Sequence, residues 1–208
     1  MSKFILIIVF LICMSSISYQ QPKINAGNSS SDKNILFIGN SLTYTNNLPK
    51  MVKNLARKKG IAVKLKTIAF PDYALIDHWK DGIAQKEIRE NNYDFVIIQQ
   101  GPSSQPEGRE MLIEYGKNFS DLCKENDTKL CYFMVWPSLT YYHTFGGVIN
   151  NYNEAAKLNG AILLPVGKIW KSNFDATNNF DYYASDGFHP SKKGSKIAAE
   201  IIVEYLFM

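Results

Sequence analysis

The sequence predicts an α/β protein whose five-stranded parallel sheet lies between two layers of helices, a three-layer α/β/α sandwich. Two observations support this fold class. Short apolar segments alternate with longer segments of helical periodicity from about residue 34 to the end of the chain. The segment 95–99 starts with an uninterrupted apolar run. Alternating strands and helices are typical of parallel sheets, and a continuously apolar strand is expected where helices cover both faces.

The expected strands differ in how much of their surface the pattern buries. In the second strand, apolar residues alternate with Lys64, Lys66 and Thr67, which is the period of a strand with one face in solvent. The fourth strand ends at Trp136-Pro137. The five expected strands cover residues 34–38, 61–70, 95–99, 129–135 and 161–165.

The expected helices begin and end at recognisable residues. The second helical segment is interrupted at Asp81-Gly82, and Pro106 opens the third, a position where proline is well tolerated. Ser191 is a suitable N-cap for the last helix, which has apolar residues at helical spacing. The expected helices cover residues 48–59, 74–91, 106–125, 148–158 and 191–206.

Composition bounds the function. A chain of 208 residues with 46% hydrophobic and 20% charged residues suits one globular domain with a full core. The formal net charge of +4 is modest, and the basic residues are scattered, so no nucleic-acid partner is expected. We find no glycine-rich phosphate loop and no cluster of metal ligands, and therefore expect neither a cofactor nor a metal.

The first residues resemble a secretion leader. Lys3 precedes the apolar run 4–13, and small residues follow, so we expect a signal peptide over 1–18. A flexible segment over 19–33 would connect it to a domain at 34–208. The protein is then exported, periplasmic or extracellular, without a stable membrane span after cleavage; an uncleaved or lipidated leader that anchors the chain is the alternative. Export would permit a disulfide between Cys123 and Cys131, but two buried thiols fit their patterns better.

Two short motifs at opposite ends of the domain carry the chemistry. Gly39-Asn40-Ser41-Leu42 directly follows the first strand, and Asp186-Gly187-Phe188-His189-Pro190 precedes the last helix. A serine nucleophile needs a base within hydrogen-bond reach, and that base needs a carboxylate that fixes its tautomer. Each motif alone has a structural explanation, since serine commonly caps helices and the second motif suits a polar turn. Together, in this order, they indicate a serine hydrolase.

These two motifs resemble those of the SGNH (GDSL-type) hydrolase superfamily over essentially the whole domain. The resemblance implies a flavodoxin-like sheet, Ser41 as the nucleophile, His189 as the general base and then acid, and Asp186 as the carboxylate that orients it.

The two middle blocks of this sequence depart from the family pattern. Where the family has a glycine whose N–H binds the oxyanion, this chain offers the backbone of Asp72 or Tyr73. In place of the oxyanion-binding asparagine, alignment on Gly101 puts Ser103, and Gln100 or its neighbour Gln99 is another source of an amide. We therefore expect oxyanion or substrate contacts from Asp72, Tyr73, Gln100 and Ser103.

Other aromatic and imidazole groups leave two interpretations open. His78 lies on a helical segment after the second strand, where it either borders the pocket or has a packing or surface role. Trp136-Pro137 and Tyr141-Tyr142-His143 follow the fourth strand, at the expected rim of a substrate site. Aromatic faces stack on sugar rings, which suggests a carbohydrate ester, although loop packing would explain these residues equally well.

The resulting hypothesis is an exported serine esterase that acts on acetyl or other short acyl esters of a small molecule or a glycan. Two alternatives stay open. The same site would serve an O-acyltransferase that passes the acyl group to a sugar hydroxyl. The altered middle blocks would also suit a non-catalytic glycan-binding module that keeps the fold. The sequence does not determine the oligomeric state.

Overall fold

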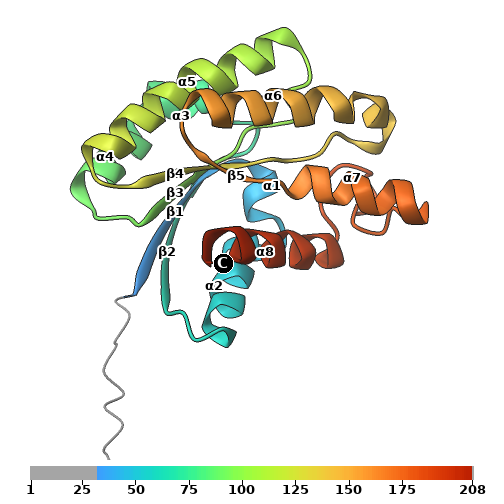
Figure 1. Ribbon diagram of the computed structural model, residues 1–208, viewed down its shortest axis with the longest axis horizontal. Helices are drawn as coiled ribbons and strands as arrows, with labels where there is room; N and C mark the ends of the chain where they lie inside the picture. Colours follow the sequence, from blue (N-terminus) through green and yellow to red (C-terminus); the bar gives the residue numbers. More distant parts are fainter. Residues whose placement is uncertain (1–31, 208) are drawn as a thin grey trace, which may run out of the picture.

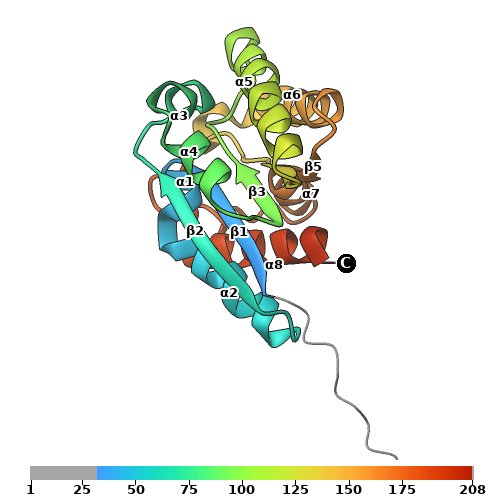
Figure 2. The ribbon, with the colours of Figure 1, turned by 90° about the vertical axis from the view of Figure 1, so that its left-hand side faces the viewer.

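A computed structural model describes residues 32–207. Within this range the chain forms one five-stranded sheet with the strand order β2-β1-β3-β4-β5, in which all neighbouring strands are parallel. Figure 2 shows β2, β1 and β3 side by side and running in the same direction. The expected α/β sandwich and its flavodoxin-like order are confirmed. The strands are β1 (Lys33–Gly39), β2 (Val63–Ala69), β3 (Phe95–Ile98), β4 (Lys129–Phe133) and β5 (Ile162–Leu164).

Helices cover both faces of the sheet (Figure 1). One layer contains α3 (Leu75–Asp81), α4 (Ile83–Glu90), α5 (Pro106–Glu125) and α6 (Phe145–Leu158). The other contains α2 (Leu48–Lys58), α7 (Val166–Thr177) and α8 (Lys192–Phe207). A short helix, α1 (Ser41–Tyr44), and two 3-10 segments, η1 (Thr45–Asn47) and η2 (Leu139–Thr144), complete the described elements.

The topology decides where a site can form. From β1 the chain crosses to β2 through α2 on one face, and from β2 it returns past β1 to β3 through α3 and α4 on the other face. At such a reversal the connecting loops diverge and leave a crevice at the carboxyl ends of the strands. Gly39 pairs with Ala69, and Ile38 with Ile98, so the segments that follow β1, β2 and β3 start side by side.

Burial follows the predicted patterns. All four residues of β3 are buried, whereas the edge strand β2 exposes Lys64, Lys66 and Thr67. Cys123 on α5 and Cys131 on β4 are buried free thiols, as their apolar surroundings suggested. Among residues 32–207, no helix is long and apolar enough to cross a membrane.

Element boundaries match the expectations closely. Gly82, with φ +75°, separates α3 from α4, and the Ser191 hydroxyl accepts a hydrogen bond from Gly194 N–H at 3.0 Å, the geometry of an N-cap on α8. The predicted signal peptide, 1–18, and the flexible segment up to residue 31 lie outside the described residues.

Sequence reasoning did not anticipate α7. Its second residue, Gly167, lowers the helical signal of the sequence. The structure explains that glycine, because its N–H donates to Met134 O at 3.0 Å and a β-carbon there would collide with Val135 O. Because the helix begins directly after β5, its first turn lies against the residues that follow β4.

Candidate active site

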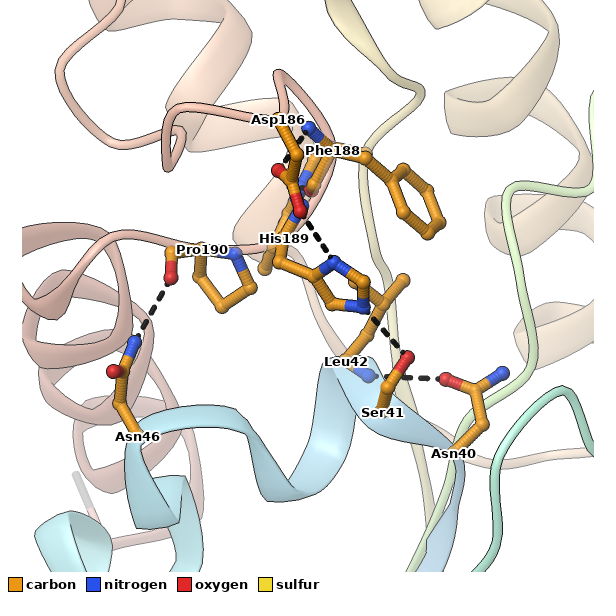
Figure 3. Close-up of polar contacts among 9 residues, drawn as sticks. Asn40, Ser41, Leu42, Asn46, Asp186, Phe188, His189 and Pro190 are labelled. Atoms are coloured by element: carbon orange, nitrogen blue, oxygen red, sulfur yellow. Dashed lines mark hydrogen bonds and ion pairs between the residues drawn. The ribbon is translucent and has the colours of Figure 1, made fainter.

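The turn after β1 presents Ser41 at the first position of α1. Asn40 is the N-cap, and its side-chain oxygen accepts a hydrogen bond from Leu42 N–H at 3.1 Å. Its side-chain amide donates to Tyr73 O at 3.0 Å, which connects this turn to the loop after β2. The serine hydroxyl therefore projects from a turn that is fixed from both sides (Figure 3).

Two buried side chains, those of Gln99 and His78, form hydrogen bonds to this turn from the protein core. Gln99 Oε1 accepts from Asn40 N–H at 3.0 Å and from the Thr43 hydroxyl at 2.7 Å. His78 is fully buried, and its Nε2 donates to Gly39 O at 2.8 Å. Burial lowers the pKa of His78 despite the hydrogen bond to Gly39, so the ring is neutral near pH 7. His78 thus has the packing role, and a surface position is excluded.

The second motif lies on a loop closed by its own backbone. Ala184 N–H donates to His189 O at 2.8 Å, and Gly187 N–H donates to Ala184 O at 3.0 Å. Gly187 adopts φ +66°, a conformation that glycine reaches without steric cost. Asp186 Oδ1 accepts from the N–H groups of Phe188 and His189, both at 2.9 Å. The carboxylate thus organises the loop as well as facing the imidazole.

Neighbouring elements hold this loop in place. Trp136 Nε1–H donates to Phe188 O at 3.0 Å, and Asn46 Nδ2 donates to Pro190 O at 2.8 Å. Trp136 was expected at the rim of the substrate site, but it is fully buried and stacks on Trp170 with ring centroids 3.6 Å apart. Of the two interpretations left open for Trp136, packing is therefore the one that the structure supports: the indole lies in the core and its N–H positions the loop.

The fold brings the two motifs together. Ser41 Oγ lies 2.9 Å from His189 Nε2, and His189 Nδ1 lies 2.7 Å from Asp186 Oδ2 (Figure 3). The two distances define a continuous hydrogen-bond chain from the hydroxyl to the carboxylate. The imidazole side chain is 35% exposed, so solvent and small ligands can reach it. This is the arrangement in which an imidazole can take a proton from a serine.

The carboxylate is held in its charged form. Burial alone would raise the pKa of Asp186, but hydrogen bonds from Phe188 N–H and from the side chain and N–H of His189 outweigh it and lower that pKa below its ordinary value. An ionised Asp186 accepts from His189 Nδ1–H. Nε2 is then the unprotonated nitrogen that faces Ser41.

A cavity of about 340 Å³ opens beside Ser41. We call it the Ser41 cavity; its wall includes Asp72, Tyr73, Gln100 and Ser103. All four residues predicted for oxyanion or substrate contacts therefore lie at this cavity. They differ in whether their N–H and O–H groups are free to donate a hydrogen bond to a ligand.

Asp72 occupies the place of the missing glycine. It adopts φ +60° in a turn with Pro71 before it and a Tyr73 N–H to Phe70 O hydrogen bond of 3.4 Å after it. Aspartate tolerates this left-handed conformation better than most residues. Within residues 32–207, neither Asp72 N–H nor Ser41 N–H has a protein acceptor, whereas Tyr73 N–H closes the turn.

The side chains of Gln100 and Ser103 serve the loop itself. Gln100 Nε2 donates to Ser103 Oγ at 2.7 Å and to Gly108 O at 3.0 Å, which uses both of its protons. The Ser103 hydroxyl donates to Gly101 O at 3.0 Å. Neither side chain keeps a proton for a ligand, so neither is a candidate oxyanion donor. The sequence pointed to the backbone of Asp72 or Tyr73, and the structure distinguishes them, because Tyr73 N–H is already bonded whereas Asp72 N–H has no acceptor among the described residues.

Among residues 32–207, no group of three or more His, Cys, Asp or Glu side chains is arranged to hold a metal ion. The chemistry described below uses the protein's own side chains.

No protein-family model and no curated protein matches this sequence. Solved structures do match it over most of the chain. A protein from Slackia heliotrinireducens, provisionally designated an SGNH hydrolase, superposes with a TM-score of 0.70 at 23% identity, covering 85% of this chain and 100% of that one. The fold is that of the SGNH hydrolases.

Two acetyl xylan esterases share this SGNH fold. AlAXEase matches with a TM-score of 0.68 at 12% identity, over 84% of this chain and 100% of its own. Axe2 from Geobacillus stearothermophilus matches with a TM-score of 0.67 at 13% identity, over 85% and 95%. At these identities the likeness concerns the SGNH fold, and the function of this chain has to be argued from its own site.

Proposed function

We propose that this protein is an exported serine esterase that hydrolyses acetyl or other short acyl esters of a glycan, with Ser41, His189 and Asp186 as its catalytic triad. The observation that carries the proposal is the 2.9 Å contact between Ser41 Oγ and His189 Nε2 across 148 positions of sequence. A packing role does not require a hydroxyl, an imidazole and a carboxylate in this order beside a cavity.

In the acylation half-reaction, the proton moves along the hydrogen-bond chain from Ser41 to His189. Ser41 Oγ attacks the ester carbonyl carbon while its proton moves to His189 Nε2. Asp186 stabilises the imidazolium that forms, because it is ionised and bonded to Nδ1. The C–O bond to the leaving alcohol then breaks, and Nε2 returns the proton to the departing oxygen. An acyl-Ser41 ester is left in the site.

Deacylation repeats these steps with water. His189 Nε2 takes a proton from a water molecule whose oxygen attacks the acyl carbon, and the bond to Ser41 Oγ breaks. The proton passes from Nε2 to Ser41, and the free acid leaves. The partly exposed imidazole gives water access to this position.

The negative oxygen that forms in both steps needs donors. Ser41 N–H lies at the first position of a helix, where backbone N–H groups are unpaired and favour negative charge. Asp72 N–H is the second donor in this proposal, because the Asp72 turn borders the same cavity. This proposed oxyanion hole has two backbone donors and no asparagine side chain, so the reaction rate depends strongly on each N–H. Loss of one oxyanion donor lowers the rate about 100- to 1,000-fold.

The glycan and the short acyl group are each favoured by one finding. The SGNH-fold structures that match this chain include two named as acetyl xylan esterases. The cavity beside Ser41 is limited to about 340 Å³, which suits a short acyl group. Export is supported by the leader-like residues 1–18, and N-terminal sequencing of the secreted protein would show whether cleavage occurs near residue 18.

The proposal is tested with p-nitrophenyl acetate and acetylated xylan. The wild-type protein should release acetate, and Ser41→Ala should reduce the rate to background. Ser172→Ala, which removes an exposed hydroxyl on α7, is the matched control and should be fully active. A fluorophosphonate should label Ser41 only. Equal rates for wild type and Ser41→Ala, or no labelling, would contradict the proposal and leave the non-catalytic module.

The acyltransferase alternative is decided by product analysis. With an acyl donor and an excess of xylo-oligosaccharide, an esterase should release free acid, whereas a transferase should form acylated oligosaccharide that depends on Ser41.

A further inference from the structure

A second cavity lies next to the Ser41 cavity and has no role in the chemistry above. We call it the outer cavity; its volume is about 410 Å³, within the range of about 300–1,000 Å³ usual for small-molecule sites. Pro102 and Phe188 line both cavities. Phe188 directly precedes His189, and the two rings lie 5.1 Å apart. A ligand that bridges the cavities would therefore pass by the catalytic imidazole.

The position of the imidazole decides which part of an ester reaches the outer cavity. His189 Nε2 has to donate its proton to the oxygen of the departing alcohol, so the alcohol must lie on the imidazole side of Ser41. The turn of Asp72 and Tyr73 borders the Ser41 cavity and not the outer cavity. The acyl group and its oxyanion belong in the Ser41 cavity. Figure 3 shows the Phe188 ring directed away from Asn46 and Pro190, and this side chain lines both cavities.

The lining of the outer cavity combines flat apolar surface with uncharged polar groups. Pro102, Pro137, Tyr141 and Phe188 supply the apolar part. Tyr141 is 60% exposed, so its ring is accessible to a ligand. Pro137 itself is held by the Tyr183 hydroxyl, which donates to its carbonyl at 2.7 Å.

The polar part consists of hydroxyl and amide groups. Among the described residues, the side chains of Gln105 and Ser138 have no hydrogen-bond partner, so their donors and acceptors are open to a ligand. None of the lining residues of this cavity is charged. An ionic headgroup or a charged peptide would find no counter-charge here, and a long acyl chain would leave the polar groups of Gln105 and Ser138 without partners. A pyranose presents both an apolar C–H face and neutral hydroxyl groups.

We propose that the outer cavity binds the sugar that carries the ester, as the leaving alcohol, with the Tyr141 ring stacked on its apolar face and Gln105 and Ser138 bonded to its hydroxyl groups. This inference rests on the proposed esterase function. It assigns the two cavities to the two halves of the substrate: acyl group beside Ser41, sugar beyond Phe188.

The test keeps the acyl group constant and changes the alcohol. Vinyl acetate has no ring to place in the outer cavity, whereas an acetylated methyl xyloside does. For each variant the measured quantity is the ratio of kcat/KM for the xyloside to kcat/KM for vinyl acetate. In Tyr141→Ala this ratio should fall about tenfold, because the sugar loses one aromatic face. Tyr141→Phe keeps the ring, and its ratio should stay within about twofold of wild type.

The control is Tyr205→Ala, which removes another exposed tyrosine ring, on α8. It should leave both rates and their ratio unchanged. A ratio in Tyr141→Ala within twofold of wild type would overturn the sugar assignment while leaving the esterase intact. Failure of wild type to hydrolyse either acetate in a Ser41-dependent way would instead overturn the proposed function, and the assignment with it. Circular dichroism of each variant confirms that it is folded.

Discussion

Asp186→Asn is the substitution for which the structure makes the sharpest prediction. Oδ1 of Asp186 accepts two backbone N–H groups, and Oδ2 accepts His189 Nδ1–H. In the asparagine variant the remaining oxygen should stay with the two backbone donors, since the opposite orientation would set an NH₂ group against both. The amide nitrogen then takes the place of Oδ2, opposite Nδ1.

This exchange moves the imidazole proton from one ring nitrogen to the other. An amide N–H that faces His189 at 2.7 Å requires Nδ1 to be an acceptor, so the proton moves to Nε2. Nε2–H then points at the Ser41 hydroxyl and can no longer take its proton. The equivalent change in a serine-protease triad lowers kcat about 10⁴-fold, which corresponds to about 5.5 kcal/mol of activation free energy.

The assay is kcat for p-nitrophenyl acetate in wild type, Asp186→Asn and the control Asp127→Asn. Asp127 is an exposed residue with φ +50°, a conformation that asparagine tolerates, and its variant should be fully active. We expect a loss of about 10³- to 10⁴-fold for Asp186→Asn with KM little changed. A variant that keeps more than a tenth of the wild-type kcat would refute this account of the carboxylate.

The same hydrogen bonds determine how the contribution of Asp186 to the free energy of unfolding depends on pH. Because the folded-state pKa of Asp186 is lowered, its contribution to stability is present above its unfolded pKa of about 3.9 and is lost as pH falls through the lower folded value. Between about pH 5 and 8 the carboxylate should therefore stay ionised in the folded protein, and an NMR titration of the Asp186 carboxyl carbon should show no protonation step in that range. A midpoint for this carboxyl between about pH 5 and 8 would contradict the prediction.

Three further predictions concern the supports of the site. Gly39→Ala would place a β-carbon against Gln99 Oε1, and should cost about 1–3 kcal/mol of unfolding free energy in urea titrations together with most activity; a wild-type midpoint would contradict this. Asn46→Ala removes the donor to the loop of His189 and should lower kcat more than it raises KM; Asn46→Gly, which suits φ +55°, should recover stability but not kcat. Burial raises the pKa of Cys123 to about 12 and also that of Cys131, so mass spectrometry should find neither alkylated by iodoacetamide at neutral pH until the protein is unfolded.

Much of the fold was predictable because strands and helices follow local hydrophobic periodicity. The helix over Pro106–Glu125 agrees with its predicted bounds, and the continuous apolar run of β3 indicated a strand covered on both faces. Where a residue serves a distant contact, the local signal fails. Gly167 weakened the pattern of α7 because of an approach to Met134, which no window along the sequence contains.

The candidate triad was predictable for a related reason. Asp186 and His189 are close in sequence and their geometry is local, and Ser41 stands in a short motif. The oxyanion side was predictable only in part: the sequence pointed to residues at the Ser41 cavity, but which of their N–H groups is free depends on which donors are already hydrogen-bonded. Gln100 and Ser103 satisfy each other, an arrangement that only a list of spatial partners reveals.

By itself, the sequence determined the order of strands and helices apart from α7, the residues able to do nucleophilic chemistry, and the two ends of the domain that have to meet. These properties depend on residue type and on spacing along the chain. The tertiary structure decided that Trp136 is buried, that the side chains of Gln100 and Ser103 are already hydrogen-bonded within their loop, and that a second, uncharged cavity adjoins Phe188. Such properties depend on which atoms are buried against one another and on which donors and acceptors are already hydrogen-bonded. Those atoms come from segments far apart in the chain.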